Sequence, residues 1–243
     1  MPRFFVNDIL PEDKFLLLQG ENAAHARVLR LQPGEAVTVC DGKGTDYACT
    51  VSDVSDKGVS LVVHSSDRST SEPQVFVTVY MGFAKADKFE HVVQKATELG
   101  AGRIVAFPCA RCVSRPDERS VAKKLERWQK IAASASEQSG RGRVPEVTAL
   151  PTYQAMLEEA TGAELAVLFY ENERSCTFRQ TIKAAPFASA ALVTGPEGGF
   201  EAQEVALAEK AGLKICTLGN RILRCETAPL CALSALMYAT GEF

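Results

Sequence analysis

The sequence has 243 residues, of which 46% are hydrophobic, enough to bury a substantial core in one large domain or two smaller ones. Its net charge of −3 gives no sign of a nucleic-acid partner, so any such partner must be held by local groups of Arg and Lys. No apolar run approaches the roughly 20 residues that cross a bilayer, and the N-terminus lacks the apolar segment of a signal peptide. We therefore expect a soluble cytoplasmic protein with no membrane partner.

The first 70 or so residues favour short strands. Residues 35–54 alternate apolar and polar positions around the turn Asp41–Gly44, which predicts a β-hairpin, and residues 58–64 predict a further strand. Only residues 21–31 have a helical pattern, which Pro33 and Gly34 would end. We expect a small barrel with one helix, followed by a polar linker at residues 65–73.

From residue 75 onward, predicted strands alternate with predicted helices. Apolar runs predict strands at residues 75–81, 103–108, 164–170, 189–195 and 213–219. Helical spacing of apolar residues predicts helices at 87–100, 120–140 and 201–212. The last helix is predicted to begin behind Thr227, a plausible N-cap, with Pro229 just inside its start. This alternation is typical of an α/β domain with a mostly parallel sheet.

Glycine-rich or polar loops follow three of these strands, at residues 168–175, 194–200 and 218–228. In a parallel sheet the carboxyl ends of the strands share one edge, where ligands bind, and glycine lets a ligand approach the backbone closely. The three loops together predict a shared ligand pocket, although each alone is also typical of a connecting turn. The segment Gly195–Phe200 is neither a Walker loop nor a GxGxxG motif, so backbone recognition of a nucleoside without a triphosphate fits it better.

Cationic side chains form a second concentration. Arg221 and Arg224 flank an apolar pair just before Glu226, while Gln138 and Arg141 lie at the end of a predicted helix. For each arginine taken singly, a solvated surface role is the favoured explanation. Arg224 is the exception, because it lies between a glycine loop and an apolar helix.

The eight cysteines mostly sit in apolar strings, where a free cysteine behaves as a small buried hydrophobe. Cys109 and Cys112 form the sole CxxC pair. Zinc sites usually need a second Cys/His pair, and the three histidines show no such spacing, so no metal site is expected. A zinc protein that uses Cys109 and Cys112 remains an alternative.

Several motifs carry a resemblance that covers the chain almost end to end. They are RFFV and HARVLRLQPGEAVTVCDGKG near the N-terminus, then KFEHVVQKATELG, ASASEQSGR, VTGPEGGF and LGNRILRCETA. Together they resemble the 16S rRNA (uracil(1498)-N(3))-methyltransferase family of the SPOUT class. The resemblance implies a PUA-like RNA-binding β-barrel at residues 1–70. It further implies an α/β SPOUT methyltransferase domain with a mostly parallel sheet and a deep trefoil knot at residues 74–243.

The resemblance also implies an activity and a site. The activity is S-adenosylmethionine-dependent methylation of uracil N3 in 16S rRNA, in the assembled small ribosomal subunit or a late precursor, by a homodimer. The implied cofactor-binding residues are Leu168, Phe169, Tyr170, Glu171, Thr194, Gly195, Pro196, Glu197, Gly198, Gly199, Phe200, Leu218, Gly219, Asn220, Ile222 and Leu223. The catalytic candidates are Arg224, Arg221, Glu226, Gln138 and Arg141, and the RNA-binding candidates are Arg3, His25, Arg27 and Arg30.

Within these candidates, Arg224 is the first choice for stabilising a developing uracil anion, with Arg221 second and Arg141 or Gln138 assisting. Glu226 is a possible general base, although a carboxylate near a helix N-terminus is also stabilised without any chemistry. Two other readings stay open. The protein could be a SPOUT methyltransferase that acts on a different RNA nucleotide, or a non-catalytic RNA-binding module whose glycine loops are only turns.

Overall fold

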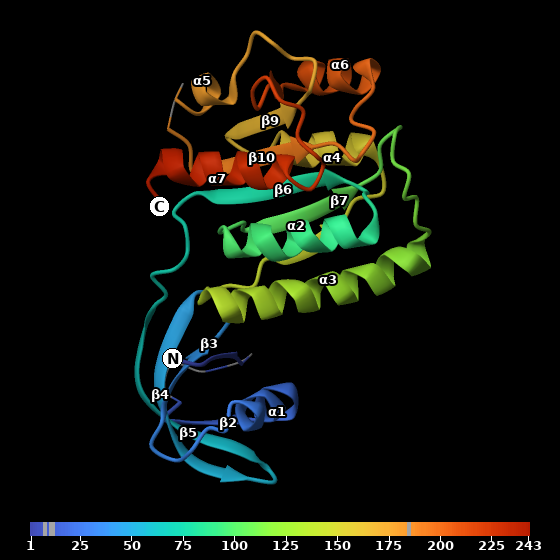
Figure 1. The fold of residues 1–243 in the computed structure, drawn as a ribbon. Helices are drawn as coiled ribbons and strands as arrows, with labels where there is room; N and C mark the ends of the chain where they lie inside the picture. The colour runs from blue at the N-terminus through green and yellow to red at the C-terminus, as the bar shows by residue number, and fades with distance from the viewer. Residues whose placement is uncertain (7–8, 10–12, 184–185) are drawn as a thin grey trace. The chain divides into compact units, whose positions relative to one another are not determined.

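The computed structural model describes residues 1–6, 9, 13–183 and 186–243 (Figure 1). The chain forms two compact units. The first consists of residues 1–72 and 136–144, and the second of residues 73–135 and 145–243.

The first unit is built on a five-stranded sheet. Its strands, in spatial order, are β1 (Arg3–Phe5), β3 (Ala36–Cys40), β4 (Thr45–Ser55), β5 (Gly58–Arg68) and β2 (Phe15–Leu18). β1 runs parallel to β3, whereas the other neighbours are antiparallel. β1 and β2 end the strand order, so the sheet is open over the described residues. The predicted barrel is therefore a curled half-barrel.

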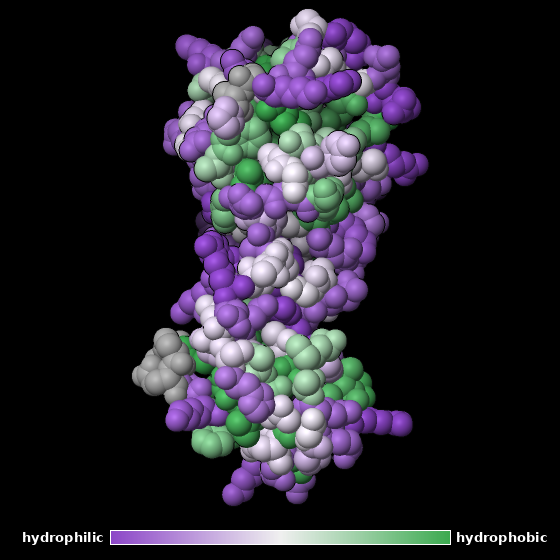
Figure 2. All heavy atoms as spheres, turned by 90° about the vertical axis from the view of Figure 1, so that its left-hand side faces the viewer, coloured by the Kyte–Doolittle hydropathy of each residue, from purple (hydrophilic) through white to green (hydrophobic). Residues whose placement is uncertain are grey.

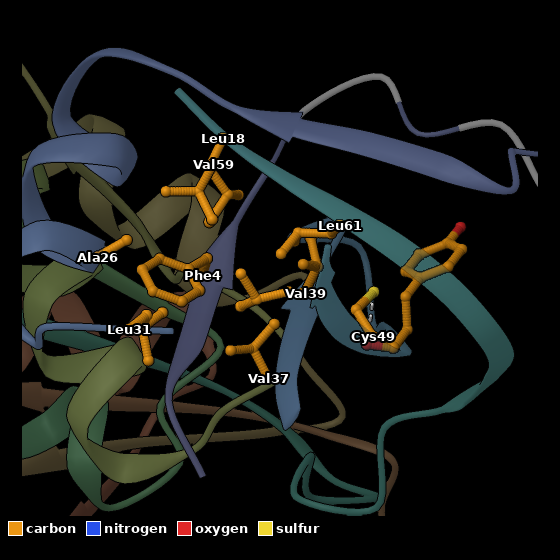
Figure 3. Packing of buried hydrophobic residues seen from close by; sticks show 11 residues of the cluster. Phe4, Leu18, Ala26, Leu31, Val37, Val39, Cys49, Val59 and Leu61 are labelled. Carbon is orange, nitrogen blue, oxygen red and sulfur yellow. Dashed lines mark hydrogen bonds between the residues drawn. The ribbon is translucent and has the colours of Figure 1, made fainter. Parts of the chain in front are cut away.

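The core of this unit is formed by alternate apolar residues of the strands together with helix α1 (Gly20–Val28) (Figure 3). Phe4, Val39 and Leu61 are completely buried in it, and Ala26 of α1 is almost so. The helix ends three residues before the predicted end. Arg30 adopts a left-handed backbone with φ 55°, which an α-helix does not allow.

The predicted hairpin turn joins β3 to β4. Asp41 Oδ1 accepts hydrogen bonds from the backbone N–H groups of Lys43 (2.7 Å) and Thr45 (3.0 Å), which fixes the turn. The predicted linker at residues 65–73 is partly wrong, because β5 continues to Arg68 and pairs with β4 along its whole length. Strand pairing uses backbone groups, so the polar side chains of residues 65–68 do not prevent it.

The second unit contains a six-stranded sheet. The strands, in spatial order, are β11 (Lys214–Cys216), β9 (Leu165–Phe169), β10 (Ser189–Thr194), β6 (Phe76–Gly82), β7 (Arg103–Phe107) and β8 (Glu146–Ala149). Every neighbouring pair is parallel, which confirms the predicted parallel α/β sheet. β8 was not predicted, because only one of its four residues is buried and it has no apolar run.

Six helices accompany this sheet, the last residues of α3 belonging to the first unit. They are α2 (Ala86–Glu98), α3 (Glu118–Ser139), α4 (Tyr153–Ala160), α5 (Phe178–Ile182), α6 (Ala202–Ala211) and α7 (Ala228–Thr240). Figure 1 shows α2 and α7 side by side on one face of the sheet, with α4 and α6 behind it. α7 begins directly after Thr227, as predicted, although the Thr227 side chain makes no capping hydrogen bond.

The three strands that precede the glycine-rich or polar loops are neighbours, in the order β11-β9-β10. Leu168 of β9 pairs with both Val193 of β10 and Ile215 of β11, so the three strands end almost level. Their loops therefore emerge together at one sheet edge, as the sequence predicted. The trefoil knot stays a prediction, because strand order and register do not establish how the chain threads.

Among the described residues, no helix is both long and apolar enough to cross a membrane. The face in Figure 2 mixes hydrophilic and hydrophobic residues and shows no continuous apolar band.

Candidate active site

The loops that follow β9, β10 and β11 surround a cavity of about 450 Å³, within the usual range for a small-molecule site. All predicted cofactor-binding residues except Leu168 line it. Leu168 is fully buried inside β9, so its side chain packs in the core below the cavity. Lining residues outside the predicted cofactor set are Lys88, Arg174, Thr217, Arg221, Arg224, Cys225 and Ala228.

The loop after β10 exposes backbone at its glycines, because a side chain would not fit at these positions. The Gly199 N–H donates to the carbonyl of Pro196 at 3.0 Å, and Gly199 has φ 65°, a conformation that favours glycine. A Cβ on Gly195 would lie 3.1 Å from Gly199 Cα, and a Cβ on Gly82, at the end of β6, would lie 2.6 Å from Pro196 Cδ. Gly195 and Gly199 are thus packed backbone against backbone within this loop.

The loop after β11 is held by Thr217. Its hydroxyl accepts from the Gly219 N–H and donates to the Gly219 carbonyl, both at 3.1 Å, while Gly219 has φ 112°. The loop ends where the Arg224 carbonyl accepts from the N–H groups of Thr227 (2.9 Å) and Ala228 (3.0 Å) at the start of α7. The glycine turn offers backbone amides and carbonyls to a flat polar group such as a nucleoside base, and the side chains of residues 220–224 complete this wall.

A cation lies between two carboxylates at the wall of the cavity. Lys88 Nζ is 3.4 Å from Glu226 Oε2, 3.6 Å from Glu197 Oε1 and 3.7 Å from Cys225 Sγ. Burial opposes the charge of Lys88, but the neighbouring Cys225, Glu226 and Glu197 raise its pKa overall. Burial also raises the pKa of the Cys225 thiol, to about 12.

Glu226 is held in its charged form. Burial favours the neutral carboxyl, yet its own backbone N–H, the Cys225 thiol at 3.2 Å and Lys88 together keep the pKa of Glu226 below its usual value. Glu226 does not itself line the cavity, but it contacts Lys88, which does.

Arg221 and Arg224 both line the cavity and are exposed. Within the described part of the chain, neither guanidinium takes part in an ion pair. Both positive charges are therefore available to an incoming anionic or polar substrate.

Two family models match the chain: an RNA methyltransferase domain over residues 70–237 and an RNA methyltransferase PUA domain over residues 18–63. Ribosomal RNA small subunit methyltransferase E of Bacillus subtilis (strain 168) is 36% identical over 250 residues, covering 99% of this chain and 97% of that protein. The chain belongs to the ribosomal RNA small subunit methyltransferase E family. A relative of the same name from Mycobacterium bovis is 34% identical and covers 99% of this chain and 92% of its own.

A crystal structure of a ribosomal RNA small subunit methyltransferase E from Neisseria gonorrhoeae, bound to S-adenosyl methionine, has the same fold. It superposes with a TM-score of 0.88 at 32% identity and covers 98% of this chain and 97% of that one. The architecture implied by the resemblance, an α/β methyltransferase part with an N-terminal PUA domain, is thereby confirmed. The chain is an RNA methyltransferase.

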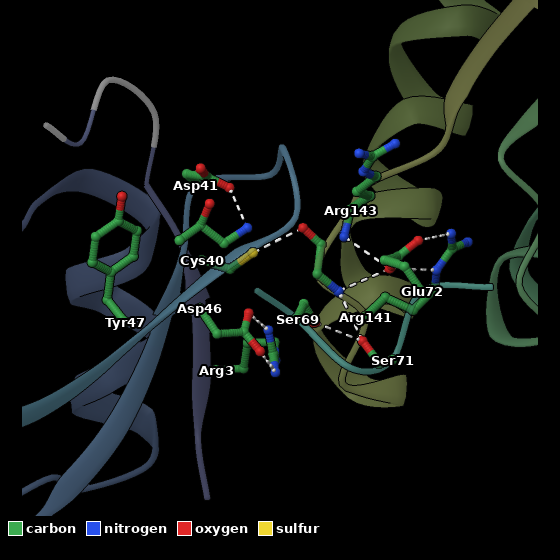
Figure 4. A network of polar contacts seen from close by, with 12 residues as sticks. Arg3, Cys40, Asp41, Asp46, Tyr47, Ser69, Ser71, Glu72, Arg141 and Arg143 are labelled. Atoms are coloured by element: carbon green, nitrogen blue, oxygen red, sulfur yellow. Dashed lines mark hydrogen bonds and ion pairs between the residues drawn. The ribbon is translucent and has the colours of Figure 1, made fainter. Parts of the chain in front are cut away.

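Two predicted catalytic residues of this methyltransferase, Gln138 and Arg141, fall in the first unit, whereas the cavity lies in the second. Gln138 is exposed. Arg141 is buried and makes an ion pair with Glu72, with 2.6 Å between Nη2 and Oε2 (Figure 4). The structure therefore gives Arg141 a partner inside its own unit.

The four predicted RNA-binding residues of the methyltransferase differ in how far they are engaged. Arg3 is paired with Asp46, 2.8 Å separating Nη2 from Oδ2 (Figure 4), and His25 Nδ1 lies 3.7 Å from Glu137. Arg27 is exposed and donates to two backbone carbonyls of the β4–β5 turn, and Arg30 is exposed. Arg27 and Arg30 thus present more of their charge to solvent than Arg3 does.

Lys88 is one of the cavity residues that sequence reasoning missed, together with Arg174, Thr217, Cys225 and Ala228. It lies on the polar side of an amphipathic helix, where lysine is common and carries no signal of its own. Its significance depends on Glu197 and Glu226, which are more than one hundred residues away in sequence. Both of these partners were named as candidates from the sequence, Glu197 for the cofactor and Glu226 for catalysis, but the lysine that contacts them was not.

The CxxC pair forms a tight turn after β7. The Cys112 N–H donates to the Cys109 carbonyl at 3.1 Å, and the two sulfurs are 3.4 Å apart and buried. Across the described residues, no group of three or more His, Cys, Asp or Glu side chains is arranged to hold a metal ion. Arg111 of this turn donates to the Gly198 carbonyl at 3.2 Å, which links the turn to the glycine loop.

Proposed function

We propose that this methyltransferase transfers a methyl group from S-adenosylmethionine to N3 of a uracil in 16S rRNA, within the small ribosomal subunit or a late precursor. The observation that carries the proposal is the cavity shared by the loops after β9, β10 and β11, whose lining includes Gly195, Gly198, Gly199 and Gly219. The similar Neisseria gonorrhoeae enzyme, which binds S-adenosyl methionine, supports the choice of cofactor.

The cofactor would be held mainly by main-chain groups. The base would be read by backbone N–H and C=O groups of Gly195–Phe200 and Leu218–Leu223, with Phe169–Glu171 as a third wall. These groups fit because positive φ at Gly199 and Gly219 turns the peptide units without a Cβ in the way. Loop shape should thus matter more for cofactor affinity than any one side chain.

The chemistry requires a charged or nearly charged uracil. Uracil N3 carries a proton at neutral pH, and that proton must leave as the N3 electron pair forms the new N–C bond. When bound, S-adenosylmethionine supplies an electrophilic methyl group whose bonding electrons stay with sulfur. Arg224, with Arg221 beside it, would donate to the uracil oxygens and stabilise the developing anion, and Glu226 would accept the proton.

The first unit would hold the RNA. Arg27 and Arg30 are exposed, and with His25 and Arg3 they would contact phosphates, which position a substrate without reading its sequence. We further propose that two copies pair, since the large apolar side chains Ile222 and Tyr238 are 82% and 76% exposed. The site of action would be the cytoplasm, where ribosomal subunits assemble.

The test is methylation of a defined substrate. Purified protein, isotopically labelled S-adenosylmethionine and small subunits from cells lacking this protein should give one labelled methyl on one uridine, located by nuclease digestion and mass spectrometry. Naked 16S rRNA and total tRNA serve as comparison substrates. Label on tRNA or on a ribose oxygen would refute the proposed target, and failure to bind S-adenosylmethionine would refute the activity itself.

A further inference from the structure

Lys88 connects three separate segments at the cavity. It comes from α2, whereas Glu197 belongs to the loop after β10, and Cys225 and Glu226 belong to the end of the loop after β11. The Lys88 side chain is 24% exposed, so the ammonium is partly withdrawn from water and its contacts are correspondingly stronger.

Each of the two carboxylates has a backbone N–H partner as well as Lys88. Glu197 Oε1 also accepts a hydrogen bond from the backbone N–H of Lys85 at 3.1 Å, at the start of α2, which anchors it independently. The Glu226 carboxylate contacts Lys88 at 3.4 Å, the Cys225 thiol at 3.2 Å and its own backbone N–H, and of these three groups Lys88 is the charged one. Lys88 is therefore the charged partner that holds the side chain of Glu226.

We propose that Lys88 is a positioning residue for methyl transfer, which keeps the Glu226 carboxylate charged and in place to accept the N3 proton of uracil. This inference rests on the proposed function, because it assigns Glu226 its role in that reaction. In the step concerned, the N3–H bond breaks and the proton goes to a Glu226 oxygen, while the N3 electron pair forms the new bond to the methyl carbon as the bond from that carbon to sulfur breaks and its electrons stay with sulfur. Lys88 touches neither the proton nor the reacting atoms and acts through Glu226.

The surrounding charges decide what loss of Lys88 would do. The groups that face Glu226 are Lys88 from α2, Glu197 from the loop after β10, and Cys225 beside it. Farther along the cavity wall lie the charged residues Glu171, Arg174, Arg221 and Arg224. Without Lys88, the negative Glu197 would face Glu226 with no cation between them, so protonation of Glu226 would become easier.

The first test needs neither cofactor nor substrate. The carboxyl group of Glu226 is titrated by NMR in protein carrying 13C-labelled glutamate, with its signal assigned by absence in Glu226→Gln. We expect Lys88→Met to raise its pKa by about one unit or more and Lys88→Arg to keep it close to the wild-type value. The matched control is Lys95→Met on the same helix, which breaks a pair with Glu98 at 2.8 Å and should leave Glu226 unchanged. Equal titration curves in Lys88→Met and Lys95→Met would overturn the proposal.

The second test measures catalysis and binding together. Lys88→Met should lower kcat about tenfold or more, and its acid limb in the pH–rate profile should move to higher pH, while calorimetric affinity for S-adenosylmethionine changes less than about threefold. The double variant Lys88→Met/Glu226→Gln should be no slower than Glu226→Gln alone. Additive losses, or an affinity loss equal to the rate loss, would show that Lys88 is merely structural.

The design separates this inference from the proposed function. If the wild-type protein methylates no RNA, the function is wrong, whereas the titration still reports whether Lys88 controls the charge of Glu226. If Lys88→Met does not fold, the methylation rates of Lys88→Arg and Glu226→Gln test the proposal instead. Lys88→Arg should stay active, and Glu226→Gln should be slow. A fully active Glu226→Gln variant would overturn the proposal.

Discussion

The guanidinium of Arg141 donates two hydrogen bonds to the carboxylate of Glu72, with Nη2 2.6 Å from Oε2 and Nε 3.2 Å from Oε1 (Figure 4). Glu72 Oε1 also accepts the backbone N–H groups of Gly142 (2.9 Å) and Arg143 (3.0 Å). The Arg141 side chain is 4% exposed. This pair therefore fixes the turn that follows α3.

The pair makes Glu72 a stability residue. Glu72→Ala should lower the free energy of unfolding by about 1–3 kcal/mol, because Arg141 loses its ion pair with this carboxylate and the backbone N–H groups of Gly142 and Arg143 lose an acceptor. Chemical denaturation at neutral pH measures the change. The control is Glu90→Ala, whose partner Arg127 is 69% exposed, and which should shift stability by no more than about 1 kcal/mol. Similar effects of the two variants would contradict the buried role of the pair.

Arg224 should matter for rate more than for cofactor binding. Arg224→Ala is expected to lower the methylation rate at least about tenfold, because a charge aimed at the developing uracil anion is removed. Calorimetric affinity for S-adenosylmethionine should stay nearly intact. Arg179→Ala, an exposed arginine of α5 outside the cavity, is the control and should change neither quantity. Parallel losses of rate and affinity would mean that Arg224 shapes the cofactor pocket.

The glycine loop should tolerate no side chain. Gly199→Val and Gly195→Val are each expected to abolish S-adenosylmethionine binding, the first through its φ of 65° and the second through the approach of Gly199 Cα. The control is Gly241→Val at the end of α7, where φ is 83° but a Cβ meets nothing within 4 Å. It should lose some stability and keep binding. Unchanged calorimetric affinity in the loop variants would remove the loop from the cofactor site.

The Arg3–Asp46 pair should make the stability of the first unit depend on pH. Burial raises the pKa of Asp46, but the hydrogen bonds and charge of Arg3 outweigh it and hold the pKa below its usual 3.8. Since the folded pKa is depressed, the stabilisation is complete well above 3.8 and is lost as pH falls through the folded value. Asp46→Asn should thus lower the urea midpoint at pH 7, and the gap from wild type should shrink below about pH 4. A gap independent of pH would rule out a charge effect.

Local pattern predicted most of the second unit, because its strands are continuous apolar runs and its longer helices have a regular apolar face. It missed β8, where parallel pairing with β7 orders a short polar segment that has no pattern of its own. It also placed the end of β5 too early, since pairing with β4 continues through residues that look like a linker. In both cases the deciding contacts are backbone pairs with a neighbouring strand, which leave no pattern in the side chains of the segment itself.

The same limit applies to the site. The glycine loops were predictable, because neighbouring parallel strands bring their carboxyl ends together whatever the side chains are. The partners of Arg141 and Lys88 were not predictable. Arg141 and Glu72 are separated by 69 positions, and Lys88 and Glu226 by 138, and ion pairs over such separations leave no periodic pattern in the sequence. Arg141 in sequence looks like a free surface cation, and only the position of Glu72 shows that it is buried and paired.

The first unit is discontinuous in sequence: the chain leaves it after Glu72, returns for Ser136–Val144, and leaves again. Cutting the gene between residues 70 and 74 would therefore not yield two whole domains. A fragment ending at Glu72 would lack Arg141, which donates to the Glu72 carboxylate. A fragment beginning at residue 73 would carry Ser136–Val144 without the rest of the first unit. During synthesis, too, the N-terminal unit cannot be completed until the ribosome has made residue 144, well over half of the chain.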